Sequence, residues 1–383
     1  MVTSPMPPVP AAPEQPATIF VALELSKARW LVGIHTPVAD KISRHGVAGG
    51  DSRAPLELIA RARRRAEQQL GRPAAVVCCY EAGYDGFWLH RLLCASGIEN
   101  HVIDPASLPV DRRARRAKTD RIDLDALLRA LMAWHRGERQ VCRVVRVPSV
   151  EEEDRRRRGR ERERLVNERV QHIGRIKGLL MTQGIRDFAP ARRDWRERLD
   201  GRRTGDGRRL PTALEAEIER ECRRLWLVID MIKAVEAERD RAASVADAGR
   251  KAALLIRFAG IGAVSAHLLV DEVFYRAFAN RREVAGFFGL ASSPHSSGSV
   301  QRDQGISRAG KPRARRVAIE LAWMWLRHQP GSGLSRWFHD RVGGTRGRFR
   351  RIMIVALARE LMAALWRYLT TGAVPEGAVM ATA

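Results

Sequence analysis

Short apolar runs alternate with helical stretches over the first third of the chain, and this alternation most restricts its fold. Four runs predict strands, at residues 18–25, 29–34, 74–80 and 101–104. Helical spacing covers the stretches between or after them, residues 56–70, 87–95 and 120–136. The continuous run AAVVCCY is typical of a buried strand. Strands that alternate with helices indicate an α/β domain.

The next region has another pattern. Residues 151–175 hold seven acids and nine arginines without a proline. Apolar residues recur at steps of three and four, which indicates a long amphipathic helix or a coiled-coil seam; they are Val166, Val170, Ile173, Ile176 and Leu180. A break covers residues 184–211, and a second helical stretch runs over 212–248. We expect an antiparallel helical arm. A charge run of this kind is most often a solvated face. If it has a function, a dimer contact and a surface for a nucleic-acid backbone are equally good interpretations.

The last region is expected to be mostly helical. Residues 252–259 and a stretch from Ser265 flank Gly260-Ile261-Gly262, which resembles a helix–hairpin–helix turn that offers amides to phosphate, or is a plain helix-breaking turn. Residues 289–312 are polar and rich in Gly and Ser, so we expect a loop. Two further helices are predicted, at residues 314–329 and 350–369.

The charge of the chain points to a polyanion. Its 68 Lys and Arg residues against 44 Asp and Glu give a formal net charge of +24. All but seven of the basic residues are arginine, which binds phosphate through two parallel hydrogen bonds. A GC-rich genome would explain arginine in place of lysine, but it would not explain the excess over acids. Nucleic acid is therefore the expected partner.

Composition excludes several other classes. The hydrophobic content of 45% is too high for a chain that is disordered throughout. Five cysteines without a CxxC pair argue against a zinc ribbon and a disulfide scaffold. No apolar run reaches membrane-spanning length, and the proline-rich N-terminus lacks the features of a signal peptide. We expect a disordered tail at residues 1–17 and a cytoplasmic, nucleoid-associated protein.

Acidic residues in the α/β region fit a metal site. Glu24 lies in an otherwise apolar strand, where a charge is costly unless it is paired or bound to a metal. Glu81 ends a later strand, at the edge of a sheet where α/β proteins bind ligands. Asp120 and Asp123 share one face of a first helical turn. Carboxylates suit Mg²⁺, and two such ions stabilise both oxygens of a phosphodiester displacement.

Each acid also has a structural interpretation. Asp120 and Asp123 would offset the helix macrodipole, Glu24 would point outward from an edge strand, and Glu81 would cap the next turn. The ordered combination of a strand acid, a strand-end acid and a helical acid pair indicates a ribonuclease-H-like fold. The basic run DRRARRAKTDR beside the helical pair offers contacts for a phosphate backbone.

A nucleophile is offered by the third region. The sequence GLASSPHSSG places a serine before glycine within a basic stretch, and a serine attacks a phosphodiester once it is activated. By itself this segment is better interpreted as a flexible loop.

Six segments together resemble the IS one-ten family of bacterial insertion-sequence transposases, the DEDD transposases also described as bridge-RNA-guided recombinases. In chain order the segments are VALELSK, YEAGYDGFWLHRLL, RRAKTDRIDLDALLRAL, GIGAVSAHLLVDEV, GLASSPHSSG and QGISRAGKPRARR. The resemblance covers residues 20–368. An ordered set of this kind is specific, whereas a single TDxxD segment is not.

The resemblance implies three domains: a RuvC-like catalytic domain at residues 18–147, a coiled-coil domain at 148–250 and a transposase domain with a serine loop at 251–372, followed by a tail at 373–383. It also implies a site in two parts. The acids that would bind Mg²⁺ are Glu24, Glu81, Asp120 and Asp123, and the serine that would bond covalently to cleaved DNA is Ser297, with Ser296 as its neighbour and substitute.

The implied partners are double-stranded donor and target DNA, a structured guide RNA and further copies of the chain, as a dimer that assembles to a tetramer. Two departures from the family pattern stand out. Glu24 occupies a position that is usually Asp, which concerns activity more than fold, and Ala259 precedes the Gly-Ile-Gly turn where proline is frequent. Asp125 is an additional helical acid to which the resemblance assigns no role.

Three functions are therefore considered. The first is an RNA-guided, Mg²⁺-dependent transposase or recombinase with a serine nucleophile. The second is a junction-resolving nuclease that uses the acids alone and forms no covalent adduct with DNA. The third is a non-catalytic nucleic-acid-binding protein from a decayed element. This function is considered because Glu24 stands where the family usually has Asp.

Overall fold

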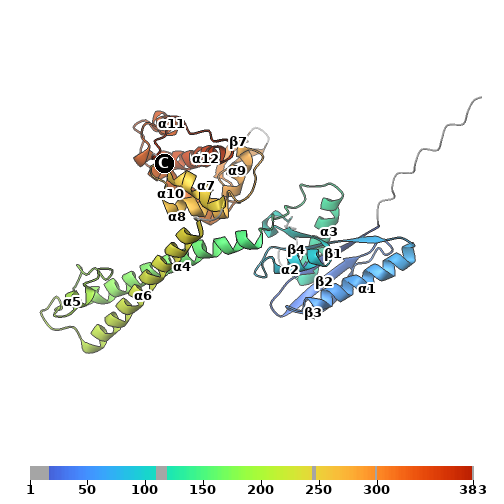
Figure 1. Cartoon of the computed structure of the whole chain (residues 1–383), viewed down its shortest axis with the longest axis horizontal. Coiled ribbons are helices and arrows are strands. Elements are labelled where there is room, and N and C mark those ends of the chain that lie inside the picture. The colour runs from blue at the N-terminus through green and yellow to red at the C-terminus, as the bar shows by residue number, and fades with distance from the viewer. Residues whose placement is uncertain (1–16, 109–118, 244–246, 298–299, 382–383) are drawn as a thin grey trace, which may run out of the picture. The chain divides into compact units, whose positions relative to one another are not determined.

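The chain divides into two compact units, residues 1–147 and 148–383 (Figure 1). The computed structural model describes residues 17–108, 119–243, 247–297 and 300–381, and for 247, 294–297 and 300–304 it describes the backbone alone. The predicted tail, apart from Ala17, and most of the basic run before Asp120 lie outside the described residues. The predicted split of the second unit into two domains stays a prediction.

A five-stranded mixed sheet forms the centre of the first unit. Its strands are β1 (Ala17–Glu24), β2 (Arg29–His35), β3 (Ser43–Ala48), β4 (Ala74–Glu81) and β5 (Glu99–Ile103). They lie in the order β3-β2-β1-β4-β5. β1 pairs antiparallel with β2 and parallel with β4, and β4 pairs parallel with β5. The α/β class predicted for this region is confirmed.

Helices cover both faces of this sheet (Figure 1). They are α1 (Arg53–Leu70), α2 (Trp88–Ala95) and α3 (Asp120–His135), with the short 3-10 helix η1 (Pro105–Ser107). Because successive strand residues point to opposite faces, Val21 and Leu23 share a core with α1 and α2. Ala22 faces the other way and packs with leucines of α3. Edge strand β3 was not predicted, because SRHGVA is mostly polar and half-exposed.

Two long helices begin the second unit. α4 (Val150–Met181) and α6 (Thr212–Ala243) have 32 residues each and pack against one another, with the short α5 (Trp195–Leu199) between them in the chain (Figure 1). Early α4 pairs with late α6 through Arg162 and Glu236, so the two run antiparallel. Ser149 and Glu152 form a capping box that fixes the start of α4. The two long helices are confirmed, although α6 ends before residue 248; their coiled-coil character stays a prediction.

Six helices and a hairpin make up the rest of the second unit. The helices are α7 (Asp247–Ile256), α8 (Ala263–Glu272), α9 (Arg281–Phe288), α10 (Pro312–His328), α11 (Gly333–Val342) and α12 (Arg348–Thr371). They share one apolar core that includes Phe258, Trp325 and Leu361. Residues 373–381, expected to be part of a tail, return to this core: the Val379 amide donates to Gln329 Oε1 at 2.7 Å.

The Gly-Ile-Gly turn has a packing role in this core. Gly260 has a φ of 94°, and a Cβ there would lie 3.0 Å from the Cβ of His328 on α10. Ile261 is buried, and Gly262 precedes the first residue of α8. The glycine at 260 is thus required by its backbone conformation and by the close approach of α10.

The predicted loop at residues 289–312 is wrong. The segment forms an antiparallel hairpin of β6 (Ser292–Ser297) and β7 (Val300–Ile306), in which Ser296 pairs with Gln301 and Ser297 with Val300. The strands escape prediction because backbone pairing stabilises them without an apolar side-chain pattern. Among the described residues no helix has the length and apolar composition that crossing a membrane requires.

Candidate active site

Two of the predicted acids lie side by side at one edge of the sheet. β1 and β4 are parallel neighbours in which Leu23 pairs with Tyr80, so the next residue of each strand, Glu24 and Glu81, ends its strand at the same edge. Both side chains are half-buried. They line a pocket of about 420 Å³ with residues of the following turns, namely Leu25, Ser26, Lys27, Ala82, Gly83, Tyr84 and Asp85. Glu24 and Glu81, both of which the sequence placed on strands, therefore lie at neighbouring strand ends and line the same pocket.

The other two acids begin α3. Thr119 caps this helix, and its hydroxyl accepts a hydrogen bond from the amide of Ile122. Asp120 is exposed and Asp123 half-buried in the first turn. Leu124 packs on Gly33 of β2, which pairs with Ala22 of β1, whereas the ring of His135 lies 5.2 Å from that of Phe20, two residues earlier in β1. These contacts direct the first turn of α3 toward the edge where β1 and β4 end.

The four acids do not form one compact cluster. In the described part of the chain, no three or more His, Cys, Asp or Glu side chains are arranged to hold a metal ion. Glu24 and Glu81 supply hard oxygen donors beside an open pocket, which suits Mg²⁺. The pair fits part of a metal site, and the contribution of Asp120 and Asp123 stays a prediction.

Asp125, which had no assigned role, has a structural one. Its carboxylate accepts two hydrogen bonds from Arg44 of β3, from Nε at 2.9 Å and from the terminal nitrogen at 2.7 Å. This hydrogen bonding raises the pKa of Arg44 further above its ordinary value. The contact joins α3 to the edge strand, so Asp125 belongs to the fold of the first unit.

The backbone at the foot of the hairpin is tightly packed. Gly289 ends α9 with a φ of 66°, and Gly310 lies against it, so that a Cβ on Gly310 would come 2.2 Å from the Gly289 nitrogen. The Lys311 amide donates to the Phe287 carbonyl at 3.1 Å. The two ends of the segment with Ser296 and Ser297 are thereby held together, and glycine is required because a side chain would not fit.

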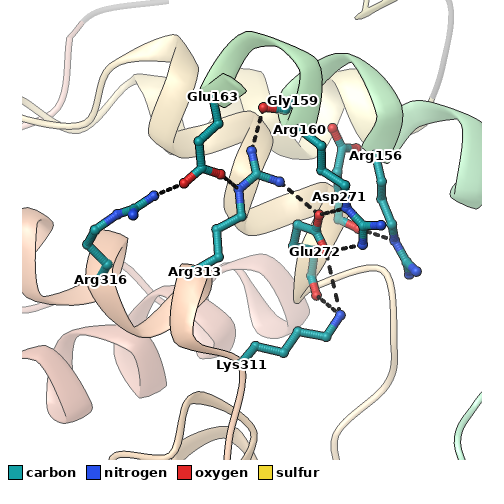
Figure 2. A network of polar contacts seen from close by, with 9 residues as sticks. All are labelled: Arg156, Gly159, Arg160, Glu163, Asp271, Glu272, Lys311, Arg313 and Arg316. Atoms are coloured by element: carbon teal, nitrogen blue, oxygen red, sulfur yellow. Dashed lines mark hydrogen bonds and ion pairs between the residues drawn. The ribbon is translucent and has the colours of Figure 1, made fainter. Parts of the chain in front are cut away.

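A buried charge network lies next to this foot and joins three helices (Figure 2). Glu272, at the end of α8, accepts hydrogen bonds from Arg160 of α4 and Arg313 of α10, both at 2.9 Å, and its carboxylate lies 3.5 Å from the Lys311 ammonium. Arg313 also faces Glu163 of α4, as Figure 2 shows.

The network sets the charge state of its members. Burial alone would raise the pKa of Glu272, but hydrogen bonds from Arg160 and the charges of Lys311 and Arg313 hold it below its ordinary value. Burial lowers the pKa of Lys311, partly offset by Glu272. Glu272 thus stays ionised, and it connects the long helix α4 to the segment that follows the hairpin.

Sequence reasoning missed two groups of residues. Lys27, Tyr84 and Asp85 line the pocket of Glu24 and Glu81; the signal was their place in the turns directly after β1 and β4. Glu272 was missed because it follows an apolar helical run and its partners lie far away in the chain. An acidic pair inside HLLVDEV was the available signal.

Comparison with known proteins identifies the family. Residues 252–335, from α7 to the start of α11, match the family model described as Transposase IS116/IS110/IS902 family. The chain is 51% identical over 375 residues, 95% of each chain, to the "Putative transposase y4rJ" of Sinorhizobium fredii. The chain belongs to the IS116/IS110/IS902 transposase family.

Another relative is more distant. The transposase for insertion sequence element IS1111A of Coxiella burnetii is 27% identical over 294 residues, covering 73% of this chain and 74% of its own. Family membership confirms the resemblance seen in the sequence motifs and gives the chain a general activity, DNA transposition, with DNA as substrate. The matched segment includes the hairpin of Ser296 and Ser297 and, from the buried charge network, Glu272 and its partners on α10 and just before it, but not those on α4.

Proposed function

We propose that this transposase is an RNA-guided DNA recombinase that uses Mg²⁺ held by acids of the first unit and a serine nucleophile of the second. The observation that carries the proposal is the shared pocket of Glu24 and Glu81 at adjacent strand ends, in a chain whose family acts on DNA. The sheet order, with three antiparallel strands followed by two parallel ones, supports the proposed ribonuclease-H-like, RuvC-type fold.

In this proposal the pocket binds the scissile phosphate. Mg²⁺, when bound, would neutralise charge on the phosphate oxygens. Glu24 and Glu81 would hold it through carboxylate oxygens, and Asp120 and Asp123 would complete the ligand set from the first turn of α3. Lys27 lines the same pocket and would contact a neighbouring phosphate. Glutamate at position 24 reaches one methylene further than aspartate, which the pocket has room for.

The covalent step belongs to Ser297, with Ser296 as its substitute. The serine oxygen would form a bond to phosphorus while the bond from phosphorus to the leaving nucleotide oxygen breaks. The serine proton passes to a base, and the leaving oxygen takes up a proton. Attack by another DNA end on the serine–phosphate bond reverses these changes and joins the strands. Protomers would combine the two parts of the site in a dimer or tetramer.

Guide RNA would supply sequence specificity by base pairing with donor and target DNA, while arginines hold the backbones. The net charge of +24 supports a protein that binds more than one nucleic-acid strand at once.

The test compares single substitutions in a recombination assay with element DNA and the RNA transcribed beside the gene. We expect Glu81→Gln to lower recombination more than about 100-fold, since loss of a metal ligand exceeds the effect of losing its supporting contacts. Glu57→Gln is the matched control, because Glu57 is exposed on α1 and lies outside the pocket residues. Equal activity of both variants would refute the metal site.

The nucleophile is tested by trapping. A denaturation-resistant protein–DNA adduct should form with the unaltered chain and disappear in Ser297→Ala. Recombination that persists without Ser296 and Ser297 would exclude the serine mechanism. DNA cleavage that depends on Glu81 but leaves no adduct would instead identify a junction-resolving nuclease. DNA binding that survives with every activity unchanged by Asp120→Asn and Asp123→Asn would favour the non-catalytic alternative.

A further inference from the structure

One stretch of the chain concentrates positive charge with no acid to balance it. Residues 341–351 contain five arginines and neither Asp nor Glu. Four of the arginines flank or begin α12, at positions 346, 348, 350 and 351, and all four are exposed. This composition differs from the long helices α4 and α6, where acids and arginines alternate.

Ion pairing sharpens this difference. In α4 and α6, several exposed arginines have acidic partners: Arg157 lies 3.6 Å from Glu153, and Arg223 lies 3.0 Å from Glu219. For the four arginines around the start of α12, no ion pair occurs with any residue that the structure describes. Their charge is therefore available to an external anion.

Exposed aromatic rings accompany these arginines. Phe349 and Trp323 are each 42% exposed, and Trp323 lies on α10, which packs beside α12. The Arg350 guanidinium lies 5.5 Å from the centroid of the Trp323 ring, so the two helices contribute to one surface. Arg327, also exposed and without an ion pair among the described residues, follows Trp323 by one helical turn and faces the same way.

We propose that this surface, the α10–α12 patch, binds single-stranded DNA. It comprises Trp323, Arg327, Arg346, Arg348, Phe349, Arg350 and Arg351. The arginines would contact phosphates, and the two rings would stack on unpaired bases, a combination that single-strand binding sites share. The inference rests on family membership, which supplies DNA as the substrate, and does not depend on the pocket of Glu24 or on Ser297.

Other occupants fit the patch less well. A second copy of the chain in a two-fold contact would bring arginines against arginines, which costs free energy. Duplex DNA would satisfy the arginines but leave both rings without partners, because its bases are already stacked. Transposition separates DNA strands at the sites of cleavage, so unpaired bases arise in its substrate.

The experiment measures binding of the full chain to a labelled single strand of about 20 nucleotides by fluorescence anisotropy over a range of salt concentrations. In the triple variant Arg348→Ala, Arg350→Ala and Arg351→Ala, we expect the slope of log affinity against log salt to fall by about 2, since each lost contact removes about 0.7. The same relation predicts about 100-fold weaker binding at about 0.1 M salt.

The matched control removes three paired arginines from the rest of the second unit, Arg157→Ala, Arg208→Ala and Arg223→Ala; Arg208 lies 2.6 Å from Asp206. It changes net charge by the same amount, and we expect its salt slope to stay that of the unaltered chain. Equal losses in both triple variants would show that only total charge matters and would overturn the proposal. Both variants alter exposed residues, so unchanged thermal unfolding verifies the fold.

The rings distinguish the kinds of nucleic acid. Phe349→Ala and Trp323→Ala should each weaken single-stranded DNA binding about tenfold, because base stacking on an aromatic ring contributes strongly, and should leave duplex DNA binding unchanged. Phe349→Tyr should keep the affinity. Equal loss for duplex DNA would refute the stacking role. A patch-dependent preference for RNA of the same sequence would overturn the assignment of DNA as its partner.

Discussion

Carboxylates of the two units have opposite surroundings. Glu24 and Glu81 are half-buried and line an open pocket at the edge of the sheet. Glu272 and Glu221 in the second unit are almost fully buried, with side chains 5% and 4% exposed. Glu221 is enclosed by the ring of His172 and the guanidinium groups of Arg175 and Arg224.

The difference shows how environment divides one residue type between two roles. A buried carboxylate is stable only when cations and donors compensate for lost hydration, and its ionic partners are then part of the fold. A carboxylate beside an open pocket keeps access to water and can exchange it for a metal ion. Sequence alone presents both kinds as an acid in an apolar context.

The largest effect expected from this comparison concerns stability. Glu272→Gln would leave Arg160, Lys311 and Arg313 without their shared anion, and we expect the free energy of unfolding to fall by about 3 kcal/mol. This loss is near the lower end of the range expected when a buried ion pair is broken, because Arg160 is half-exposed. Glu81→Gln, matched in chemistry, should change stability by less than about 1 kcal/mol while it abolishes recombination. Urea denaturation measures both, and equal losses would contradict the division of roles.

A pH effect is expected beside this network. Burial, opposed by Arg155 and Arg158, raises the pKa of Asp271 to about 6 from an ordinary 3.8. Because the folded state keeps a proton that the unfolded state releases, stability should fall as pH rises from about 4 to about 6, by about 2 to 3 kcal/mol. Asp271→Asn stays neutral in both states and should remove this fall.

The measurement for Asp271 is the difference between the unaltered chain and Asp271→Asn in urea denaturation across this pH range, so that other titrating groups cancel. Arg155 Nε lies 3.6 Å from the Asp271 carboxylate. A difference that is constant with pH would mean that this ion pair keeps Asp271 ionised throughout.

The elements of the fold were predictable where apolar residues form long regular patterns. β1 and β4 and the two long helices of the second unit follow from such patterns, since burial of one face or stripe dictates them. β3 and the hairpin of Ser296 and Ser297 were missed, because their residues are mostly polar and show no alternating apolar pattern. A polar strand gives no periodic signal.

The candidate site was predictable where its residues follow from the ends of individual strands. Parallel neighbours end at one edge, so the pairing of Glu24 with Glu81 could be expected once both runs were taken as strands of one sheet. The Glu272 network could not, since Arg160 is 112 residues away in the chain and burial of a single acid leaves no local pattern. Long-range ion pairs depend on tertiary packing that the sequence does not show.

The smallest expected effect concerns Asp125, a carboxylate of the first unit that, like Glu272 and Glu221, has an ionic partner within the fold. Asp125 and Arg44 are partly exposed, 19% and 26%, and form a two-pronged contact. A double-mutant cycle of Asp125→Asn and Arg44→Gln should give a small, favourable coupling free energy, slightly above that of simple surface pairs because the geometry is bidentate. Recombination should persist in Asp125→Asn under conditions where the chain stays folded. Loss of recombination at full stability would place Asp125 among the residues that act on DNA, and the structural role of its contact with Arg44 would then not account for it.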